Sequence, residues 1–417
     1  MSTLSHPGDA LTRGARLTYV LVLGALIGLG PFTVDLYLPA FPAVRVELLA
    51  TEAAVQITLT ATMIGFAVGQ LLLGPWSDVV GRRLPLLLAT TVHIAASVGV
   101  ALAPDILTVT VLRVVEGVGA AGGSVVAMAM VRDLFGGSSL VRMLSRLALV
   151  SGLAPIVAPV VGSQLLRVLD WRGLFIALAA YSLLVLVLVA VFIVETLPAE
   201  RRRARRHSSA ADRYRALFGD RVFLGIVAVS GAMFSDLIAY VSSSSFVLQE
   251  VYGLDPQAYG VVFAVNSVGL AIGAQTAARA VRRVGPQWLL AVTLPTMALA
   301  GLGIVIAVGL GLGLPAVLVG TFVFLVGAGF SFPCLQVIAL APHGEEAGTA
   351  AAMLGLANFG TAGVVSPLVG LLGTETAVPM GAVMAATLGV ATLVLWLVVR
   401  PRSVPALDAE APAPAAH

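Results

Sequence analysis

The stretch Gly74-Pro75-Trp76-Ser77-Asp78-Val79-Val80-Gly81-Arg82-Arg83 lies between two long apolar runs and is the most informative part of the sequence. It brings one acid, two arginines and two turn glycines together between hydrophobic segments. Glycine permits a tight backbone turn, and Asp78 can form charge-assisted hydrogen bonds with Arg82 or Arg83. The stretch therefore predicts a gating loop, which joins neighbouring helix ends in one conformation and releases them in another.

The composition is that of an integral membrane protein. Of the 417 residues, 59% are hydrophobic and 11% are charged, whereas soluble domains carry roughly 25% charged residues. Cys334 is the single cysteine, which excludes an intramolecular disulfide and any cysteine-rich zinc site. All 24 basic residues are arginine, and together with the abundance of Ala, Val, Leu and Gly this suggests a bacterial source with a GC-rich genome.

Twelve apolar runs are long enough to cross a bilayer, which takes about 20 helical residues. They are expected to be helices because hydrocarbon offers no water to unpaired backbone groups. The first run is expected to be retained, since no small-residue cleavage site follows a short apolar core. The predicted spans are residues 17–38, 54–73, 84–103, 106–131, 141–164, 173–194, 222–250, 259–279, 287–309, 314–340, 347–369 and 380–399.

The arginines predict the orientation, because basic residues gather in cytoplasmic loops. Twenty of the 24 arginines fall on one side if the N-terminus is cytoplasmic. Both termini are then cytoplasmic, and the protein is expected in the bacterial cytoplasmic membrane. The polar segments are residues 1–16, the linker 195–221 and the tail 400–417, which is Pro/Ala-rich and expected to be disordered.

The linker divides the chain into two predicted six-helix bundles, residues 17–194 and 222–399. A repeat is supported by residues 279–285, which follow span eight as the gating loop follows span two. This second loop is basic and contains glycine but lacks the acid, so inward closure is expected to depend mainly on Asp78. Two related halves with a binding site between them are typical of alternating-access transporters.

Five motifs resemble the major facilitator superfamily, and within it the twelve-span drug/proton antiporters of the bicyclomycin- and chloramphenicol-resistance group. They are Gly74-x-x-x-Asp78-x-x-Gly81-Arg82-Arg83, Asp35-Leu36-Tyr37-Leu38-Pro39, Arg113-Val114-Val115-Glu116-Gly117, the span-five run from Gly152 to Gly162, and Ser245 to Leu254. The sequence departs from the family pattern at Val79, where arginine is common, and at Glu116, where glutamine is common. The resemblance implies an all-α major facilitator fold and antiport.

Few ionisable residues lie inside the spans, where each costs at least about 2.5–3.5 kcal/mol. Asp35 is expected to couple protons to substrate, because burial favours its neutral form while Arg113 or a cationic substrate favours its ionised form. Asp35 and Arg113 lie at similar depth and could pair between spans one and four. The alternative for Asp35 is a structural helix cap.

Two further acids allow two interpretations each. Glu116 lies three residues after Arg113, on the same helical face, so these two could line a cavity or simply neutralise each other. Asp236 is either a second proton- or cation-binding acid or a residue hydrogen-bonded to serines. His93 is expected to be packed rather than to relay protons.

Span five and several polar residues supply the remaining candidates. Gly152, Pro155, Pro159 and Gly162 remove backbone donors and permit close helix approach, which predicts either a gate against leak or ordinary packing. Candidate cavity residues that could orient a drug in an apolar pocket are Tyr37, Tyr240, Asn266, Gln336 and Asn358.

The sequence contains no ATP-binding loop, hydrolase nucleophile elbow or histidine cluster, so no enzyme activity, cofactor or metal is expected. We therefore expect a monomeric, proton-coupled multidrug or chloramphenicol-type exporter, whose partners are small drugs, protons and membrane lipid rather than nucleic acid. A metabolite transporter of the same fold is the alternative, and a membrane-embedded enzyme or receptor is a third.

Overall fold

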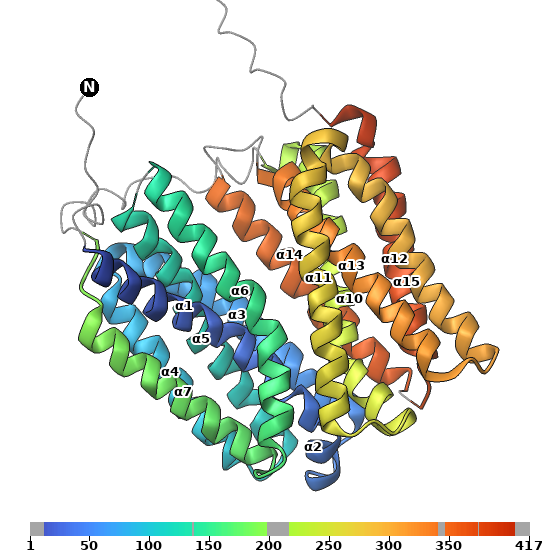
Figure 1. Cartoon of the computed structure of the whole chain (residues 1–417), viewed down its shortest axis with the longest axis horizontal. Coiled ribbons are helices and arrows are strands. Elements are labelled where there is room, and N and C mark those ends of the chain that lie inside the picture. Colours follow the sequence, from blue (N-terminus) through green and yellow to red (C-terminus); the bar gives the residue numbers. More distant parts are fainter. Residues whose placement is uncertain (1–11, 136, 198–216, 341–346, 374, 405–417) are drawn as a thin grey trace, which may run out of the picture. The chain divides into compact units, whose positions relative to one another are not determined.

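The computed structural model describes residues 12–135, 137–197, 217–340, 347–373 and 375–404 (Figure 1). Within these ranges the chain forms helices and turns without a β-strand, which confirms the predicted all-α fold. Most of the predicted linker, of the polar N-terminal segment and of the tail lies outside the described residues.

The first half of the sequence forms six long helices. Their ends are set in part by side-chain caps: Thr51, Asp105 and Asp170 each accept a hydrogen bond from a backbone N–H of the first turn that follows. The elements are α1 (Arg13–Asp35), η2 (Leu38–Ala40), α2 (Phe41–Glu47), α3 (Glu52–Val80), α4 (Arg83–Ala101), α5 (Ile106–Leu134), α6 (Gly137–Leu165) and α7 (Trp171–Phe192).

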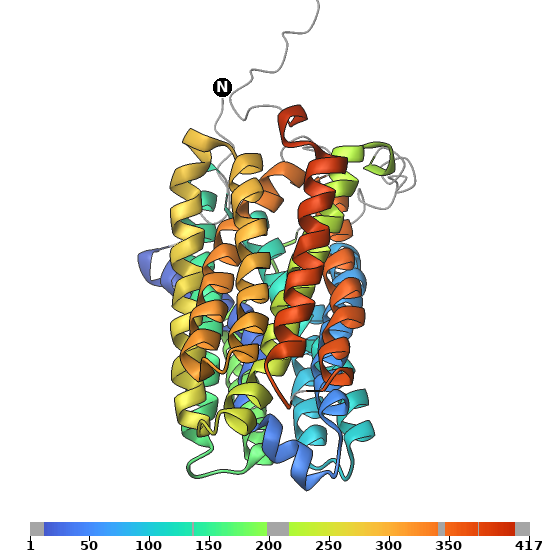
Figure 2. The same cartoon turned by 90° about the vertical axis from the view of Figure 1, so that its right-hand side faces the viewer.

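The second half contains six more long helices, and α12 packs against both α13 and α15 (Figures 1 and 2). The elements are α10 (Arg221–Phe246), the π-helical turn η4 (Val247–Val251), α11 (Pro256–Val284), α12 (Pro286–Gly309), α13 (Gly313–Leu340), α14 (Ala347–Leu371), α15 (Val378–Val394), η5 (Leu395–Val399) and η6 (Pro401–Ser403).

The helix lengths agree with the predicted spans. Among the described residues, 11 helices are long and apolar enough to cross a membrane, and Gly152–Leu165 of α6 is a shorter apolar helix. The twelve long helices correspond one by one to the twelve predicted runs.

By contacts, the chain divides into two compact units that are not continuous in sequence. The first unit contains α1 to α7 together with residues 241–265 and 366–376, and the second contains the rest of α10 to α15. A hydrophobic core in the first unit joins α1, α5, α6 and α7. The repeat of two six-helix bundles, 17–194 and 222–399, stays a prediction.

Glycines allow α3 and α5 to touch along their backbones. A Cβ atom added to Gly65 would overlap the carbonyl group of Val114 and lie 3.0 Å from the Cα of Gly117. One added to Gly69 would lie 2.7 Å from the Cβ of Ala121. Small residues in membrane helices serve this close approach, which positions α5 and the polar residues that it carries.

Replacing Gly65 with Leu should therefore destabilise the protein, because overpacking costs about 1–3 kcal/mol and the backbone of α5 cannot move aside cheaply. We expect the thermal unfolding temperature of the detergent-solubilised protein to fall. Gly303→Leu is the matched control, because an added Cβ there meets no atom within 4 Å. Equal unfolding temperatures for the two variants would contradict this account of the α3–α5 contact.

Candidate functional site

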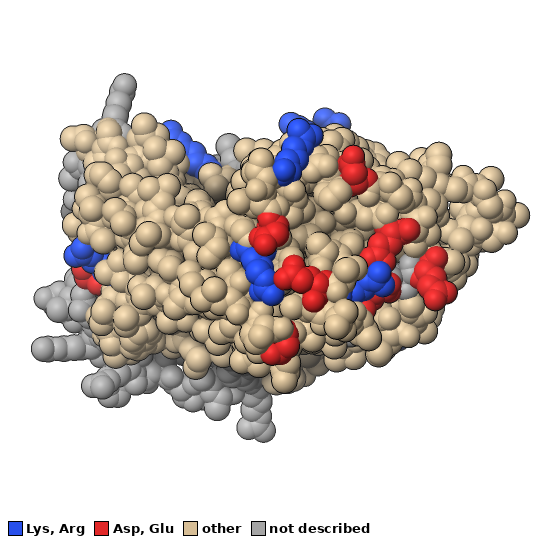
Figure 3. Space-filling model, turned by 90° about the horizontal axis from the view of Figure 1, so that it is seen from below, with Lys and Arg blue, Asp and Glu red and all other residues tan. Residues whose placement is uncertain are grey.

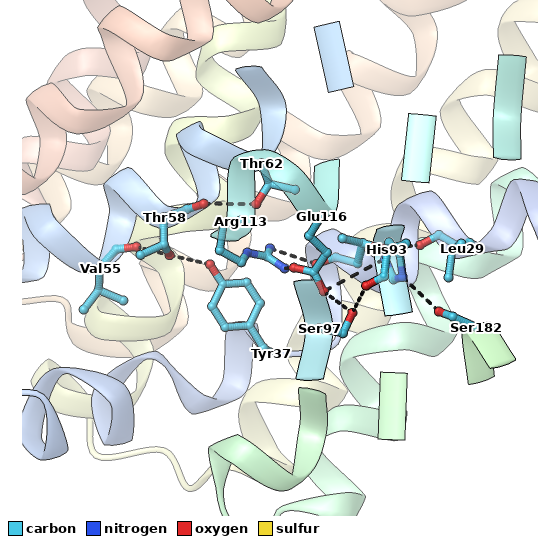
Figure 4. A network of polar contacts seen from close by, with 11 residues as sticks. Leu29, Tyr37, Val55, Thr58, Thr62, His93, Ser97, Arg113, Glu116 and Ser182 are labelled. Atoms are coloured by element: carbon cyan, nitrogen blue, oxygen red, sulfur yellow. Dashed lines mark hydrogen bonds and ion pairs between the residues drawn. The ribbon is translucent and has the colours of Figure 1, made fainter. Parts of the chain in front are cut away.

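A buried arginine is the centre of a polar network inside the first unit (Figure 4). Arg113 of α5 is fully buried, and its Nη1 donates to Oε2 of Glu116 at 2.6 Å. Its Nη2 donates to the backbone carbonyl of Thr33 in α1 at 2.9 Å. Both bonds are charge-assisted, so the guanidinium group is compensated by a carboxylate and by a helix end.

The bond to Thr33 has a physical cause in the way α1 ends. The last four carbonyl groups of a helix have no intrahelical partner. In α1, which ends at Asp35, the backbone N–H of Leu36 donates to Phe32, while Arg113 donates to Thr33. A cation at the negative end of the helix dipole is favourable. Arg113 therefore stabilises the point at which α1 ends.

Glu116 extends the network to α4 and α7. Its Oε1 accepts a hydrogen bond from the hydroxyl group of Ser97 at 2.6 Å and lies 4.0 Å from Nε2 of His93. The two ring nitrogens of His93 lie 2.8 Å from Oγ1 of Thr33 and 3.0 Å from Oγ of Ser182. His93 is thus packed, as expected, but no sequence pattern indicated that Ser97 and Ser182 share its network.

Asp35 does not pair with Arg113, so that prediction is wrong. The guanidinium group is held by Glu116 on the same helix, where the spacing of three residues brings the two side chains together, and by Thr33. The Asp35 side chain is only 6% exposed and makes no ion pair or hydrogen bond within the described part of the chain. It is not a helix cap either, because the C-cap of α1 is Leu36.

Tyr37 packs against this network. The Arg113 guanidinium carbon lies 4.3 Å from the centre of the Tyr37 ring and 5.5 Å from that of Phe175, as in cation–π contacts. The Tyr37 hydroxyl group lies 2.6 Å from Oγ1 of Thr58 in α3. With 2% of its surface exposed, Tyr37 shields Arg113.

The other candidate cavity residues lie in the second unit and are not brought together as one cluster. Tyr240 is buried, and its hydroxyl group accepts a hydrogen bond from Asn266 at 2.7 Å. Asn358 accepts one from Ser230 at 2.8 Å. Gln336 is exposed. The expectation that these residues orient a drug stays a prediction.

Asp236 lies fully buried in α10, and its bonded partner comes from α15. Oδ1 lies 2.5 Å from Oγ1 of Thr387, while Oδ2 is buried without a hydrogen-bond partner. The predicted bonds to serines are therefore replaced by one to a threonine, which no sequence pattern singled out.

Helix α6 approaches the end of α1 through a glycine. A Cβ atom added to Gly162 would overlap the backbone carbonyl of Leu36, whereas one added to Gly152 would meet no atom within 4 Å. Pro155 and Pro159 lie inside the helix. Gly162 thus serves close packing, and a gating role for this stretch stays a prediction.

The predicted gating loop is held inside the first unit by Arg82. Its Nη1 lies 2.7 Å from Oδ1 of Asp78, and its Nε donates to Oδ2 of Asp133 at 2.8 Å. The side chain of Asp133 is 7% exposed and that of Asp78 is 34% exposed. Burial lowers the pKa of Arg82, but Asp133 and Asp78 outweigh it and raise the pKa above its ordinary value.

A second acid bonds to the backbone of this loop. The carboxylate of Glu195 accepts hydrogen bonds from the backbone N–H groups of Arg82 at 2.9 Å and Arg83 at 3.2 Å, at the start of α4. A carboxylate is favourable at a helix N-terminus. Gly81 has φ of 107°, a conformation that favours glycine. Sequence reasoning missed Asp133 and Glu195, which directly follow predicted spans, where charges are ordinary.

At the opposite end of the first unit, two motifs from different halves of the sequence meet. The carbonyl group of Leu38 accepts a hydrogen bond from the Ser245 hydroxyl at 2.6 Å, and that of Pro39 accepts one from Nε2 of Gln249 at 3.1 Å. We call this end of the first unit the Pro39 end. The order of the motifs predicted the fold but not that these two would contact each other.

Ion pairs also lie at the Pro39 end. Figure 3 shows this end from below, with acidic and basic side chains beside one another. Arg45 lies 3.3 Å from Glu52 and 3.0 Å from Glu250 of η4. Arg172 pairs with Glu47 at 3.0 Å. Exposed pairs of this kind contribute about 0–1 kcal/mol each, so they can be broken at low cost.

The two partners of Arg82 should differ in their contribution to stability. Asp133→Asn removes a buried charge partner and should lower the free energy of unfolding by about 3–5 kcal/mol. Asp78→Asn removes a partly exposed one and should cost about 0–1 kcal/mol. Denaturant unfolding of the two variants in the same detergent tests the difference. A larger loss for Asp78→Asn would show that the loop depends on the acid of the motif itself.

Comparison with known proteins gives one consistent result. A model of the Major Facilitator Superfamily matches residues 21–367. The uncharacterized MFS-type transporter YdgK of Bacillus subtilis is 33% identical, and the bicyclomycin resistance protein homolog of Haemophilus influenzae is 30% identical. Each match covers 91% of this chain and 95% of the relative. These matches confirm the family resemblance carried by the motifs.

Among solved structures, a D-xylose-proton symporter matches with a TM-score of 0.75 over 95% of this chain and 100% of its own. The sequence identity is 17%, so this likeness concerns the fold alone. It agrees with the predicted major facilitator fold.

Proposed function

Because the chain belongs to the Major Facilitator Superfamily, we propose that it exports small amphipathic antimicrobials, of the multidrug or chloramphenicol type, in exchange for protons. Its cycle is alternating access, in which the binding site opens first to one side of the membrane and then to the other. The relative named as a bicyclomycin resistance protein homolog supports a drug as substrate. A proton gradient supplies the energy.

The observation that carries this proposal is the state of Asp35. Its carboxyl group is almost fully buried at the end of α1, and no cation compensates it within the described residues. Arg113 is held by Glu116 and Thr33 instead. A buried carboxylate without a partner is costly, so Asp35 binds either a proton or a cationic substrate. This competition couples export to proton entry.

The charge balance around Asp35 favours cations over anions. Arg113 and Glu116 neutralise each other, and two aromatic rings cover the guanidinium group. Asp35 then contributes the uncompensated charge of this region whenever it is deprotonated. Cationic amphipathic drugs are the substrates that gain most from it, and neutral chloramphenicol-type compounds gain less.

The orientation follows from the arginines. In the predicted topology, twenty of the 24 fall on the side of the gating loop and the two termini, so we expect that side to be cytoplasmic by the positive-inside rule. The protein then works in the bacterial cytoplasmic membrane as a monomer surrounded by lipid, and the Pro39 end faces outward.

The alternative is a metabolite transporter of the same fold. The structural likeness to a D-xylose-proton symporter gives this alternative its basis. The direction of proton movement on addition of substrate distinguishes the two, because antiport and symport move protons oppositely relative to substrate.

Asp35→Asn should abolish export driven by a pH difference, since the amide cannot bind and release a proton. We expect ethidium movement in proteoliposomes to fall to the protein-free background, while the variant keeps the unfolding temperature of the wild type. Asp105→Asn is the matched control at the same end. Hydrogen bonds from Thr108 hold the pKa of Asp105 below its usual range, so it stays ionised. Full exchange by Asp35→Asn would refute the assignment.

Glu116→Gln should weaken the preference for cations, because it leaves the positive charge of Arg113 without its carboxylate near the end of α1, the helix that carries Asp35. We expect the export of ethidium to fall about tenfold, which corresponds to about 1.4 kcal/mol, while that of neutral chloramphenicol changes less. The double variant Arg113→Gln/Glu116→Gln removes both charges and should restore the preference for ethidium, measured on protein shown to be folded by its circular dichroism spectrum and size-exclusion profile. Equal losses for both compounds in Glu116→Gln, with no recovery in the double variant, would contradict a charge effect.

A further inference from the structure

The contacts of Asp236 in the second unit raise the question of which group supplies each hydrogen atom. Oγ1 of Thr387 lies 2.5 Å from Oδ1 of Asp236 and 2.6 Å from the backbone carbonyl oxygen of Val383. Two oxygens approach this closely only with a hydrogen atom between them. Thr387 has one hydroxyl hydrogen, and a carbonyl group has none to donate.

A protonated carboxyl group can supply the second hydrogen. The Thr387 hydroxyl group can donate to Asp236 or, as threonine side chains do in helices, to Val383 within α15; in the second case a protonated Asp236 donates to Thr387. With a protonated carboxyl group, each of the two contacts of Thr387 contains one hydrogen atom. With an ionised carboxylate, the two contacts share the single hydroxyl hydrogen of Thr387.

The surroundings of Asp236 agree with a neutral acid. Its side chain is fully buried, and Oδ2 has no hydrogen-bond partner. No charged side chain interacts with it among the described residues. Tyr240, one turn further along α10, is bonded to Asn266. A carboxylate here would be uncompensated, at a cost of several kcal/mol.

We propose that Asp236 is a second proton-binding site, held by Thr387 in this conformation and emptied in another step of the transport cycle. This inference rests on the proposed exchange of drug for protons and extends it. Asp35 exchanges its proton for the substrate, and Asp236 carries a further proton, so two protons enter for each drug molecule exported.

The second proton changes the driving force. Exchange of one proton for one monovalent cation moves no net charge and responds only to the pH difference. Exchange of two protons moves one net positive charge inward, so the membrane potential contributes about 2.3 kcal/mol per 100 mV. Dependence on the potential therefore reports whether Asp236 takes part.

The first experiment uses ethidium, a monovalent cation, in proteoliposomes at equal pH on both sides, with a potential imposed by potassium and valinomycin. The wild type should move ethidium in response to the potential. Asp236→Asn should lose this response but keep the movement driven by a pH difference. The control is Asp220→Asn, which lies just before α10 and should behave as the wild type. Potential-driven movement by Asp236→Asn equal to that of the wild type would overturn the proposal, as would a wild type that responds to pH alone.

The second experiment reads the protonation state without transport. Infrared spectra of the purified Asp35→Asn protein should contain the carbonyl band of a protonated carboxylic acid. The band should vanish in Asp35→Asn/Asp236→Asn and change frequency in Asp35→Asn/Thr387→Val. Its absence from Asp35→Asn would refute a protonated Asp236. Because this readout needs no substrate, it stands even if drug export itself is disproved.

Discussion

The contact between Arg113 and the end of α1 is the constraint on which the rest of the first unit depends. A fully buried guanidinium group must be compensated, and a helix that ends inside a membrane protein leaves carbonyl groups that also need partners. One side chain meets both needs, since Arg113 binds the carboxylate of Glu116 and the carbonyl group of Thr33. Its rigid planar fork suits two partners at once, which a lysine would not reproduce.

The early end of α1 has consequences further along the chain. The 3₁₀ turn Leu38–Ala40 contains a proline, and the carbonyl groups of Leu38 and Pro39 accept hydrogen bonds from Ser245 and Gln249, which lie in α10 and η4. Partly exposed ion pairs of Arg45 accompany these bonds, and the buried rings of Phe41 and Phe246 lie 5.8 Å apart at the same end. In the proposed alternating-access cycle these contacts would break and form again, and the low individual energies of the ion pairs suit that purpose.

The sequence predicted the fold better than the site. Hydrophobic run lengths identified all twelve long helices, because the bilayer fixes the length of a span. The Asp35–Arg113 pairing failed because depth along a helix does not give its rotation, and Glu116 was closer on the same face. Asp133 and Glu195 look like ordinary charges after a span, and Thr387 is one threonine among many. Such partners are determined by packing between segments far apart in sequence.

The two buried acids differ in a way that gives each a separate task. Asp35 makes no ion pair or hydrogen bond within the described residues, so under the proposed function its occupant changes between a proton and a cationic drug. Asp236 is bonded to a threonine on another helix, and under the proposal of a second proton site its proton belongs to that contact. In the proposed cycle, loss of a proton from Asp236 would require α10 and α15 to rearrange, whereas exchange at Asp35 would require only access. A carboxyl group bonded between helices ties proton release to a conformational step, and an unbonded one ties it to substrate binding.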